Sequence, residues 1–201
     1  MQIRKVGYPL GQFFTLIYQG KNSAGVSQYL AKDGTLTTNP TTSDYRYAGS
    51  PQPKLNYGWS NSFTYKNFDL SIFLRGVYGN KIFNATRADL FRPSTAAYTN
   101  ILVDAANESA KDGNAFRYSS RFIESGSYLR LENMTLGYTF KKPIKYIENV
   151  RLYTTVNNLF VITKYTGVDP EVNMGGMSPG IDSNNFYPKT RTILFGVNVN
   201  F

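Results

Sequence analysis

Alternating apolar and polar positions are clearest at the C-terminal end of the sequence, in residues 191–201. Apolar side chains take every second position, and polar or small side chains take most of the positions between them. The apolar positions are Ile193, Phe195, Val197, Val199 and Phe201. A period of two predicts a β-strand with one apolar and one mostly polar face. The final residue is aromatic, whereas the end of a soluble chain is usually frayed and polar.

The same alternation recurs in two adjoining runs, residues 55–65 and 68–79. Only Lys66 and Asn67 separate them, and two turn residues between alternating runs predict a β-hairpin. Each run is about as long as the roughly 9–11 residues that a tilted strand needs to cross a bilayer.

Three further segments complete the predicted set of strands. Residues 127–140 and 149–162 alternate over most of their length, and residues 5–18 form a weaker strand that Pro9 and Gly11 interrupt. Pro9 and Gly11 make this N-terminal segment the least regular of the six.

The apolar phase of residues 127–140 changes part-way along. Leu131 falls on the face opposite to Met134 and Leu136. We therefore predict either a β-bulge near Asn133 or a strand that leaves the membrane at that point.

The connections between these strands alternate in length. The short connections are 66–67 and 141–148, and the long ones are 19–54, 80–126 and 163–190. Short turns at one end and long loops at the other are typical of outer-membrane barrels. We predict an all-β fold, an antiparallel meander of about six amphipathic strands. It would form an open segment of a large transmembrane β-barrel with long external loops.

The alternation in the last strand predicts which side chains of the barrel wall face the lumen and which face lipid. Leu194, Gly196 and Asn198 are expected to face the lumen. The apolar set of the last strand, except Phe201, is expected to face lipid. The longest connection, 80–126, contains two candidate short helices, ATRADLF and TNILVDAAN, and a loop of that length is usually functional.

Composition removes most enzyme chemistry. The chain has no cysteine and no histidine, so it lacks thiolate ligands and the commonest general base. No Ser/His/Asp, Cys/His or paired-carboxylate arrangement can be built, so we predict neither an enzyme nor a cofactor or metal site. The 16 tyrosines and 14 phenylalanines suit an all-β protein.

The net charge is +9, but the basic residues are spread along the chain. No RNA-binding signature accompanies them, so we predict no nucleic-acid partner. A solvated or lipopolysaccharide-facing surface accounts for the charge.

Five stretches resemble a known family, in the family's order and over nearly the whole chain. They are Val6–Tyr18, Gly49–Leu74, Arg121–Phe140, Arg151–Pro170 and Tyr187–Phe201. Sequences such as SYLRLENMTLGYTF and NNLFVITKYTGVDPE resemble the C-terminal part of SusC/RagA-type TonB-dependent outer-membrane transporters. In that family a large barrel with an N-terminal plug pairs with a SusD-type surface lipoprotein.

The resemblance implies partners and a location. The partners are the SusD-type lipoprotein, TonB acting through the plug, the barrel-assembly machinery, lipid and lipopolysaccharide, and an oligosaccharide or peptide solute. The location is the outer membrane of a Gram-negative, Bacteroidetes-like cell. The family's energy for import comes from TonB.

We expect residues 1–201 to be the C-terminal part of such a barrel, without the plug domain and the N-terminal strands. About six strands cannot close a barrel, because the smallest barrels use eight. Residues 1–11 also lack the apolar region and cleavage site of a secretory signal.

The resemblance also implies an assembly signal in the last strand. Gly196, Val199 and Phe201 match the family-type pattern, whereas Leu194 stands where a polar residue is usual.

Eight polar or aromatic side chains are candidate lumen or loop contacts for a solute, and each has a simpler structural interpretation. Asp69 and Arg75 would otherwise form wall salt bridges, and Arg87, Asp89, Arg92 and Tyr98 would be solvated loop residues. Asp169 and Glu171 carry oxygens at alternate positions, which suits Ca²⁺, but the spacing is not that of an EF-hand and a loop turn fixed by Asp-Pro is the favoured interpretation.

Two other functions stay open at this point. The chain would be a soluble β-sandwich that binds carbohydrate if the apolar faces of its strands met in one core. It would be a non-functional truncated remnant if it could neither fold nor insert alone.

Overall fold

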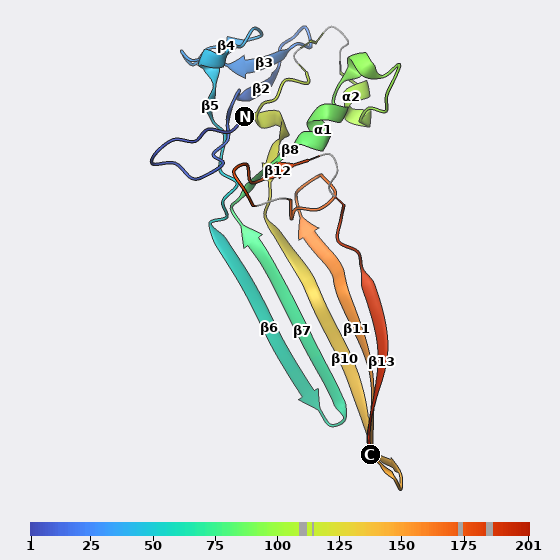
Figure 1. The fold of residues 1–201 in the computed structure, drawn as a ribbon. Coiled ribbons are helices and arrows are strands. Elements are labelled where there is room, and N and C mark those ends of the chain that lie inside the picture. Colours follow the sequence, from blue (N-terminus) through green and yellow to red (C-terminus); the bar gives the residue numbers. More distant parts are fainter. Residues whose placement is uncertain (109–111, 114, 173–174, 184–186) are drawn as a thin grey trace. The chain divides into compact units, whose positions relative to one another are not determined.

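A computed structural model describes residues 1–108, 112–113, 115–172, 175–183 and 187–201. The chain divides into two compact units, each assembled from three separate stretches (Figure 1). The strand unit comprises Leu55–Tyr78, Tyr128–Thr163 and Pro188–Phe201, and the loop unit comprises Met1–Lys54, Gly79–Ser127 and Lys164–Tyr187. Among the described residues, no helix has the length and apolar character needed to cross a bilayer.

The strand unit is one five-stranded sheet in the order β13-β11-β10-β7-β6. Its strands are β6 (Leu55–Tyr65), β7 (Phe68–Tyr78), β10 (Tyr128–Ile144), β11 (Ile147–Thr163) and β13 (Thr192–Asn200). Every neighbouring pair is antiparallel. The predicted all-β fold class of an open barrel segment is therefore confirmed.

Residues 5–18, the sixth predicted segment, do not join this sheet. Gly11 has a φ of 79° and Pro9 lacks an N–H, so the chain turns here instead of extending. Only β1 (Phe14–Thr15) and the start of β2 at Tyr18 form ladders, and both pair within the loop unit.

The β10–β11 hairpin is longer than the sequence indicates. The strands continue to Ile144 and resume at Ile147, so only two residues connect them. Their register is irregular between Lys141 and Ile144, and Pro143 lies in that irregular part. Proline is accommodated there because an irregular ladder does not require its missing N–H.

A bulge explains the phase change in β10, as one of the two sequence alternatives predicts. The register shifts between Leu131 and Asn133 against both neighbouring strands. Against β7 the extra residue is Glu132 on β10, whereas against β11 the extra residue lies on β11, where Asn158 and Leu159 stand against Glu132. The shift places Leu131 opposite Leu74 and Phe160. The apolar row thus continues across three strands on one face.

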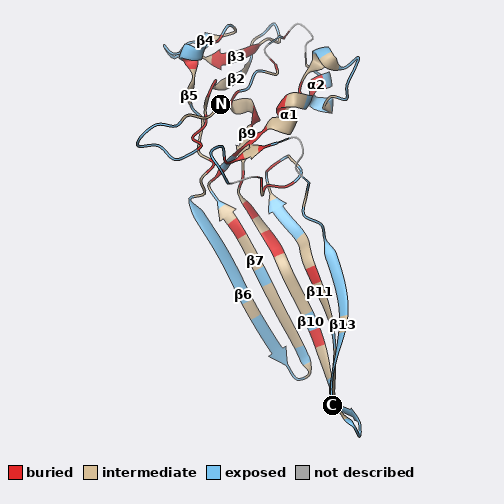
Figure 2. Ribbon diagram, viewed as in Figure 1, coloured by how far each residue is buried: buried red, intermediate tan, exposed pale blue. Residues whose placement is uncertain are grey.

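The two faces of the sheet differ in chemistry. The polar face carries cross-strand pairs in register, including an Asn133–Asn157 hydrogen bond of 2.7 Å and a Thr135–Thr155 hydrogen bond of 2.8 Å. The outer strands β6 and β13 are exposed along nearly their whole length (Figure 2). Apolar side chains there include Phe195, which is 84% exposed.

The described part of the loop unit contains short strands in three small sheets. The strands are β1, β2 (Tyr18–Lys21), β3 (Ser27–Leu30), β4 (Leu36–Thr37), β5 (Arg46–Tyr47), β8 (Lys81–Asn84), β9 (Ile123–Ser125) and β12 (Ile181–Asp182). The sheets are β1-β5, β2-β3-β4 and β12-β8-β9. The two predicted helical segments form α1 (Ala85–Leu90) and α2 (Val103–Ala106). Single 3₁₀ turns cover Thr42–Asp44, Pro93–Thr95 and Ser120–Phe122.

The loop unit has a hydrophobic core of its own. Phe13, Phe83, Phe91 and Phe122 are its aromatic members, and each is at most 3% exposed. The rings of Phe91 and Phe122 meet edge to face at 5.7 Å, a favourable aromatic geometry. The long connections of the barrel-like sheet therefore form a packed body rather than structureless loops.

Candidate functional site

Two clefts in the loop unit gather polar and charged side chains. The arginine cleft has a volume of about 560 Å³, and its walls include Tyr45, Arg92, Phe116, Arg117 and Tyr118. The asparagine cleft has a volume of about 380 Å³, and its walls include Asn84, Arg87, Asp104, Thr166 and Asp182. Both are candidate solute-contact sites because they combine apolar walls with few, oriented polar groups.

Asn84 organises the asparagine cleft from the end of β8. Its Oδ1 accepts a hydrogen bond of 2.8 Å from the backbone N–H of Arg87, so Asn84 caps the start of α1. Its Nδ2 donates to Glu124 and to Thr166, at 3.2 and 3.3 Å. The cap places the Arg87 side chain on the first turn of the helix, beside β9.

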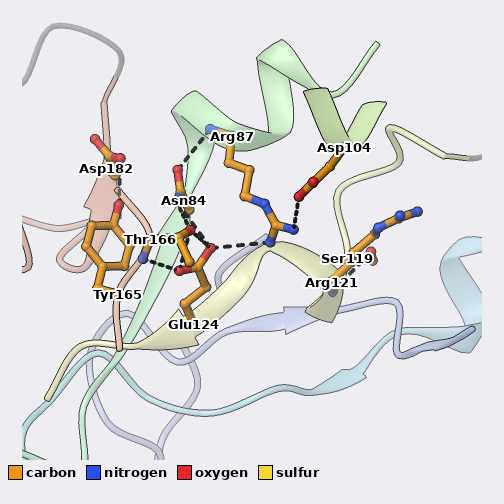
Figure 3. Close-up of polar contacts among 9 residues, drawn as sticks. All are labelled: Asn84, Arg87, Asp104, Ser119, Arg121, Glu124, Tyr165, Thr166 and Asp182. Carbon is orange, nitrogen blue, oxygen red and sulfur yellow. Dashed lines mark hydrogen bonds and ion pairs between the residues drawn. The ribbon is translucent and has the colours of Figure 1, made fainter. Parts of the chain in front are cut away.

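Glu124 on β9 joins three segments at this point (Figure 3). It accepts hydrogen bonds of 2.8 Å from both the backbone N–H and the hydroxyl of Thr166. Arg87 Nη1 lies 3.4 Å from the same carboxylate, and Arg87 Nη2 lies 3.9 Å from Asp104. The Glu124 side chain is only 11% exposed, and these partners offset its desolvation.

A tyrosine–aspartate pair completes this cleft. The Tyr165 hydroxyl donates to Asp182 Oδ2 over 2.6 Å, and both residues are buried. Burial raises the pKa of Tyr165 well above its usual value, and the hydrogen bond to the Asp182 carboxylate raises it further. The phenol therefore stays protonated and serves as a fixed donor.

The arginine cleft is organised by one carboxylate. Asp89 accepts a hydrogen bond of 2.9 Å from the Tyr118 hydroxyl and lies 3.4 Å from Arg92 Nη2. This hydrogen bond raises the pKa of Tyr118, and burial adds to it. The Arg92 guanidinium lies over the Phe116 ring, 5.4 Å from its centre, which is cation–π geometry.

The predicted loop contacts fall into different places. Arg87 lies in the asparagine cleft, and Asp89 and Arg92 come together at the arginine cleft. Tyr98 is 87% exposed and lines neither cleft.

The predicted Asp169–Glu171 pair forms a turn. Asp169 is 3% exposed, and its Oδ1 accepts a hydrogen bond of 2.9 Å from the Glu171 backbone N–H. This contact is the side-chain-to-backbone bond of an Asx-turn. Within the described residues, no group of three or more potential metal ligands gathers at this or any other place.

Asp69 and Arg75 belong to the strand unit and are ion-paired there. Asp69 receives two hydrogen bonds from Arg151, of 2.9 and 2.5 Å. Arg75 donates to Glu132 and to the Tyr128 hydroxyl, each over 2.7 Å. The wall salt bridges expected as the simpler interpretation are thus present, and solute contact by these residues stays a prediction.

The predicted assembly residues lie along β13 and just after it. A Cβ at Gly196 would overlap the Tyr153 ring on β11, so Gly196 has a packing role. Val199 lies opposite Val150, and Phe201 is 89% exposed beside the β10–β11 turn. Their part in assembly stays a prediction.

Sequence reasoning missed several residues of the two clefts. Asn84 was open to recognition, because asparagine directly before a helical run signals an N-cap. Glu124, Thr166 and Arg117 carry no local signal, since their partners lie at least 37 residues away in the chain.

Comparison with known proteins identifies relatives of this chain. No family model matches the sequence. The chain is 32% identical to TonB-dependent receptor SusC of Bacteroides thetaiotaomicron and 30% identical to TonB-dependent receptor P3 of Formosa agariphila. Both alignments cover 100% of this chain but only 20% and 23% of those relatives. The chain thus spans about a fifth of their length.

Solved structures agree on the fold. The RagAB peptide importer in its closed-closed state superposes with a TM-score of 0.79 at 21% identity, and in its open-open state with a TM-score of 0.76 at 21% identity. Each match covers 98% of this chain and 24% or 23% of the solved chain. The fold is that of a segment of a β-barrel. The chain matches TonB-dependent receptors of the SusC/RagA type along its whole length, which confirms the resemblance seen in its motifs.

Proposed function

We propose that the chain forms part of the wall and external loops of an outer-membrane TonB-dependent importer of glycan or peptide fragments. The observation that carries this proposal is the whole-length match to receptor SusC at 32% identity. The remaining strands and the plug through which TonB acts belong to sequence beyond these 201 residues. A SusD-type lipoprotein is the proposed surface partner.

The two faces of the sheet support this assignment. The exposed apolar face suits lipid and lipopolysaccharide, because hydrocarbon covers side chains such as Phe195 that water would not favour. The polar face, with Asp69–Arg151 and Arg75–Glu132, suits a hydrated lumen. Gly196, Val199 and Phe201 are the proposed contacts for the barrel-assembly machinery.

The loop unit supplies the proposed contacts for solute or lipoprotein. Arg87, Asp89 and Arg92 lie in or beside its clefts, and Tyr98 is exposed elsewhere on it. The relatives are named as receptors, and the proposal assigns no catalytic step to this chain.

The β-sandwich alternative is physically disfavoured. It requires the apolar faces of residues 55–65, 68–78 and 191–201 to meet in one core. Instead β6, β7 and β13 lie in one sheet, and side chains such as Leu55 and Val197 are 56% and 60% exposed. Side chains in one layer cannot form the interior of a sandwich.

The proposal is tested in a cell that expresses the complete receptor with a tag in an exposed loop. We expect the tag in the outer-membrane fraction, import of a solute that stops when TonB is deleted, and a lipoprotein that co-purifies with the receptor. A chain that is monomeric and water-soluble without detergent would contradict the proposal. A chain that neither folds nor inserts unless the missing strands are supplied is the outcome that the truncated-remnant alternative predicts.

A further inference from the structure

We infer that the arginine cleft binds an acidic sugar unit, a ring that carries a carboxylate. This inference rests on the proposed import function and adds the chemical class of the solute. The cleft is assembled from four stretches of the loop unit, which meet around Leu16, Thr41, Arg92 and Phe116. Its volume of about 560 Å³ is large enough for an oligosaccharide unit.

The charges of the cleft favour an anion. Among the residues that the structure describes, its lining includes Arg92 and Arg117 but no carboxylate. Arg92 contacts the carboxylate of Asp89. The same carboxylate accepts a hydrogen bond from the Tyr118 hydroxyl, so it is shared between two donors. Arginine is well suited to such a site because its planar fork matches a carboxylate with two parallel hydrogen bonds.

The Arg92 side chain has a buried part and an exposed part. The Nε of Arg92 is buried and has no hydrogen-bond partner among the described residues. Because this nitrogen is closed off from solvent, a ligand in the cleft would contact the terminal nitrogens of Arg92 instead. The Arg92 side chain as a whole is 40% exposed, so a ligand can reach its guanidinium from the cleft.

The remaining walls favour a sugar over a peptide. Tyr45, Phe116 and Tyr118 provide aromatic surface, and Tyr118 is 42% exposed. Arg92 and Arg117 can only donate hydrogen bonds, so the charged part of the lining demands acceptors. An acidic sugar presents carboxylate and ring oxygens as acceptors, and its hydroxyl groups both donate and accept, so they can also pair with the hydroxyls of Thr41 and Tyr45 in the lining.

Binding of trigalacturonate to the complete receptor in detergent tests the inference by calorimetry. The methyl ester of the same trisaccharide keeps its shape and loses its charge. We expect the acid to bind at least about tenfold more tightly than the ester, and the difference to shrink as salt rises. Equal binding of acid and ester would overturn the inference.

Variants locate the binding in this cleft. Arg92→Gln should weaken trigalacturonate binding about tenfold or more, and adding Arg117→Gln should weaken it further. Lys32→Gln is the matched control, because it removes one exposed positive charge from the same unit and lies outside the cleft. Arg92→Lys keeps the positive charge near Asp89 but removes the guanidinium group, and it should bind trigalacturonate with intermediate affinity. This variant therefore separates the loss of the guanidinium hydrogen bonds from a loss of folding.

Besides equal binding of acid and ester, three outcomes contradict the inference. They are an unchanged affinity in Arg92→Gln, an equal loss in Lys32→Gln, and tighter binding of triglutamate than of trigalacturonate, which would assign the cleft to acidic peptides. The proposed import function fails separately, through absence of TonB-dependent uptake. Trigalacturonate binding that depends on Arg92 would uphold the cleft even then.

Discussion

Phenylalanine side chains lie in different environments in the two units. In the loop unit Phe13 and Phe122 are fully buried, whereas in the strand unit Phe195 is 84% exposed and Phe63 is 50% exposed. The loop unit therefore has a buried apolar core of its own. The strand unit leaves that surface for something outside the chain to cover.

Their charged residues differ in the same sense. In the strand unit, ion pairs such as Asp69–Arg151 link strands of one regular ladder. In the loop unit, one carboxylate often holds segments far apart in sequence: Glu108 pairs with Lys21 and with Arg121. The difference shows that hydrogen-bonded register holds the wall together, whereas the loop unit depends on a core and on long-range polar bridges.

The largest expected effect comes from breaking the core of the loop unit. Phe122→Ala should destabilise that unit by about 3–5 kcal/mol, because it leaves a cavity beside Phe91. The matched change Phe195→Ala in the wall should cost about 1 kcal/mol or less, because that ring is already exposed. Thermal unfolding in detergent, followed by tyrosine circular dichroism, measures both. Equal losses would show that the two units do not differ in this way.

A charge on either face of β13 tests which face meets lipid. Val197→Lys should oppose insertion by about 2–4 kcal/mol, since it places an ammonium on the proposed lipid face. Leu194→Lys makes the same change on the opposite face and should have a much smaller effect. The fraction of receptor that resists extraction from the outer membrane reports insertion. If the two variants insert equally, the assigned facing is wrong.

Periodicity predicts the wall well because each strand carries its own signal. The bulge at Glu132 was detectable for this reason: a change of phase between Leu131 and Met134 is a local property of the sequence. The strand predicted over residues 5–18 was wrong in its first half. The apolar content suggested a strand there, but Pro9 and the positive φ of Gly11 produce a turn.

The clefts were much less predictable. Charge and aromatic content pointed to Arg87 and Arg92 in the longest connection, but not to their surroundings. Arg117 approaches the backbone carbonyl of Pro40 from 77 residues away, and Thr166 reaches Glu124 across 42 residues. Such long-range contacts depend on how three loops pack together. The local sequence pattern of one loop does not encode that packing.

The role of Gly196 provides a third and smaller test. Gly196→Ala should cost about 1 kcal/mol, because the added methyl group displaces the end of the Tyr153 ring from its packed position. Gly113→Ala is the control, since a Cβ there meets nothing within 4 Å. Tyr153→Ala removes the ring and should restore assembly of Gly196→Ala, as measured by heat-resistant barrel on a gel. Failure of this rescue would favour direct recognition of Gly196 by the assembly machinery.

The smallest effect is confined to alkaline pH and belongs to the loop unit alone. Burial, with the Asp112 carboxylate second, raises the pKa of Tyr29 to about 12. An unfolded tyrosine loses its proton near pH 10. Below that pH both states are protonated and the stability is complete. As the pH rises from about 10 to about 12, the unfolded chain ionises first and the stability of the loop unit falls.

Replacing Tyr29 with phenylalanine isolates this contribution. Tyr29→Phe should cost about 1 kcal/mol at neutral pH through lost polar contacts, and should lose less stability than the unchanged protein between pH 10 and 12. Tyr98→Phe, at an 87% exposed position, should leave the pH dependence unchanged. Urea unfolding at a series of pH values, followed by tyrosine circular dichroism, gives both slopes. A slope that Tyr29→Phe does not reduce would mean that this buried phenol does not couple the loop unit to pH.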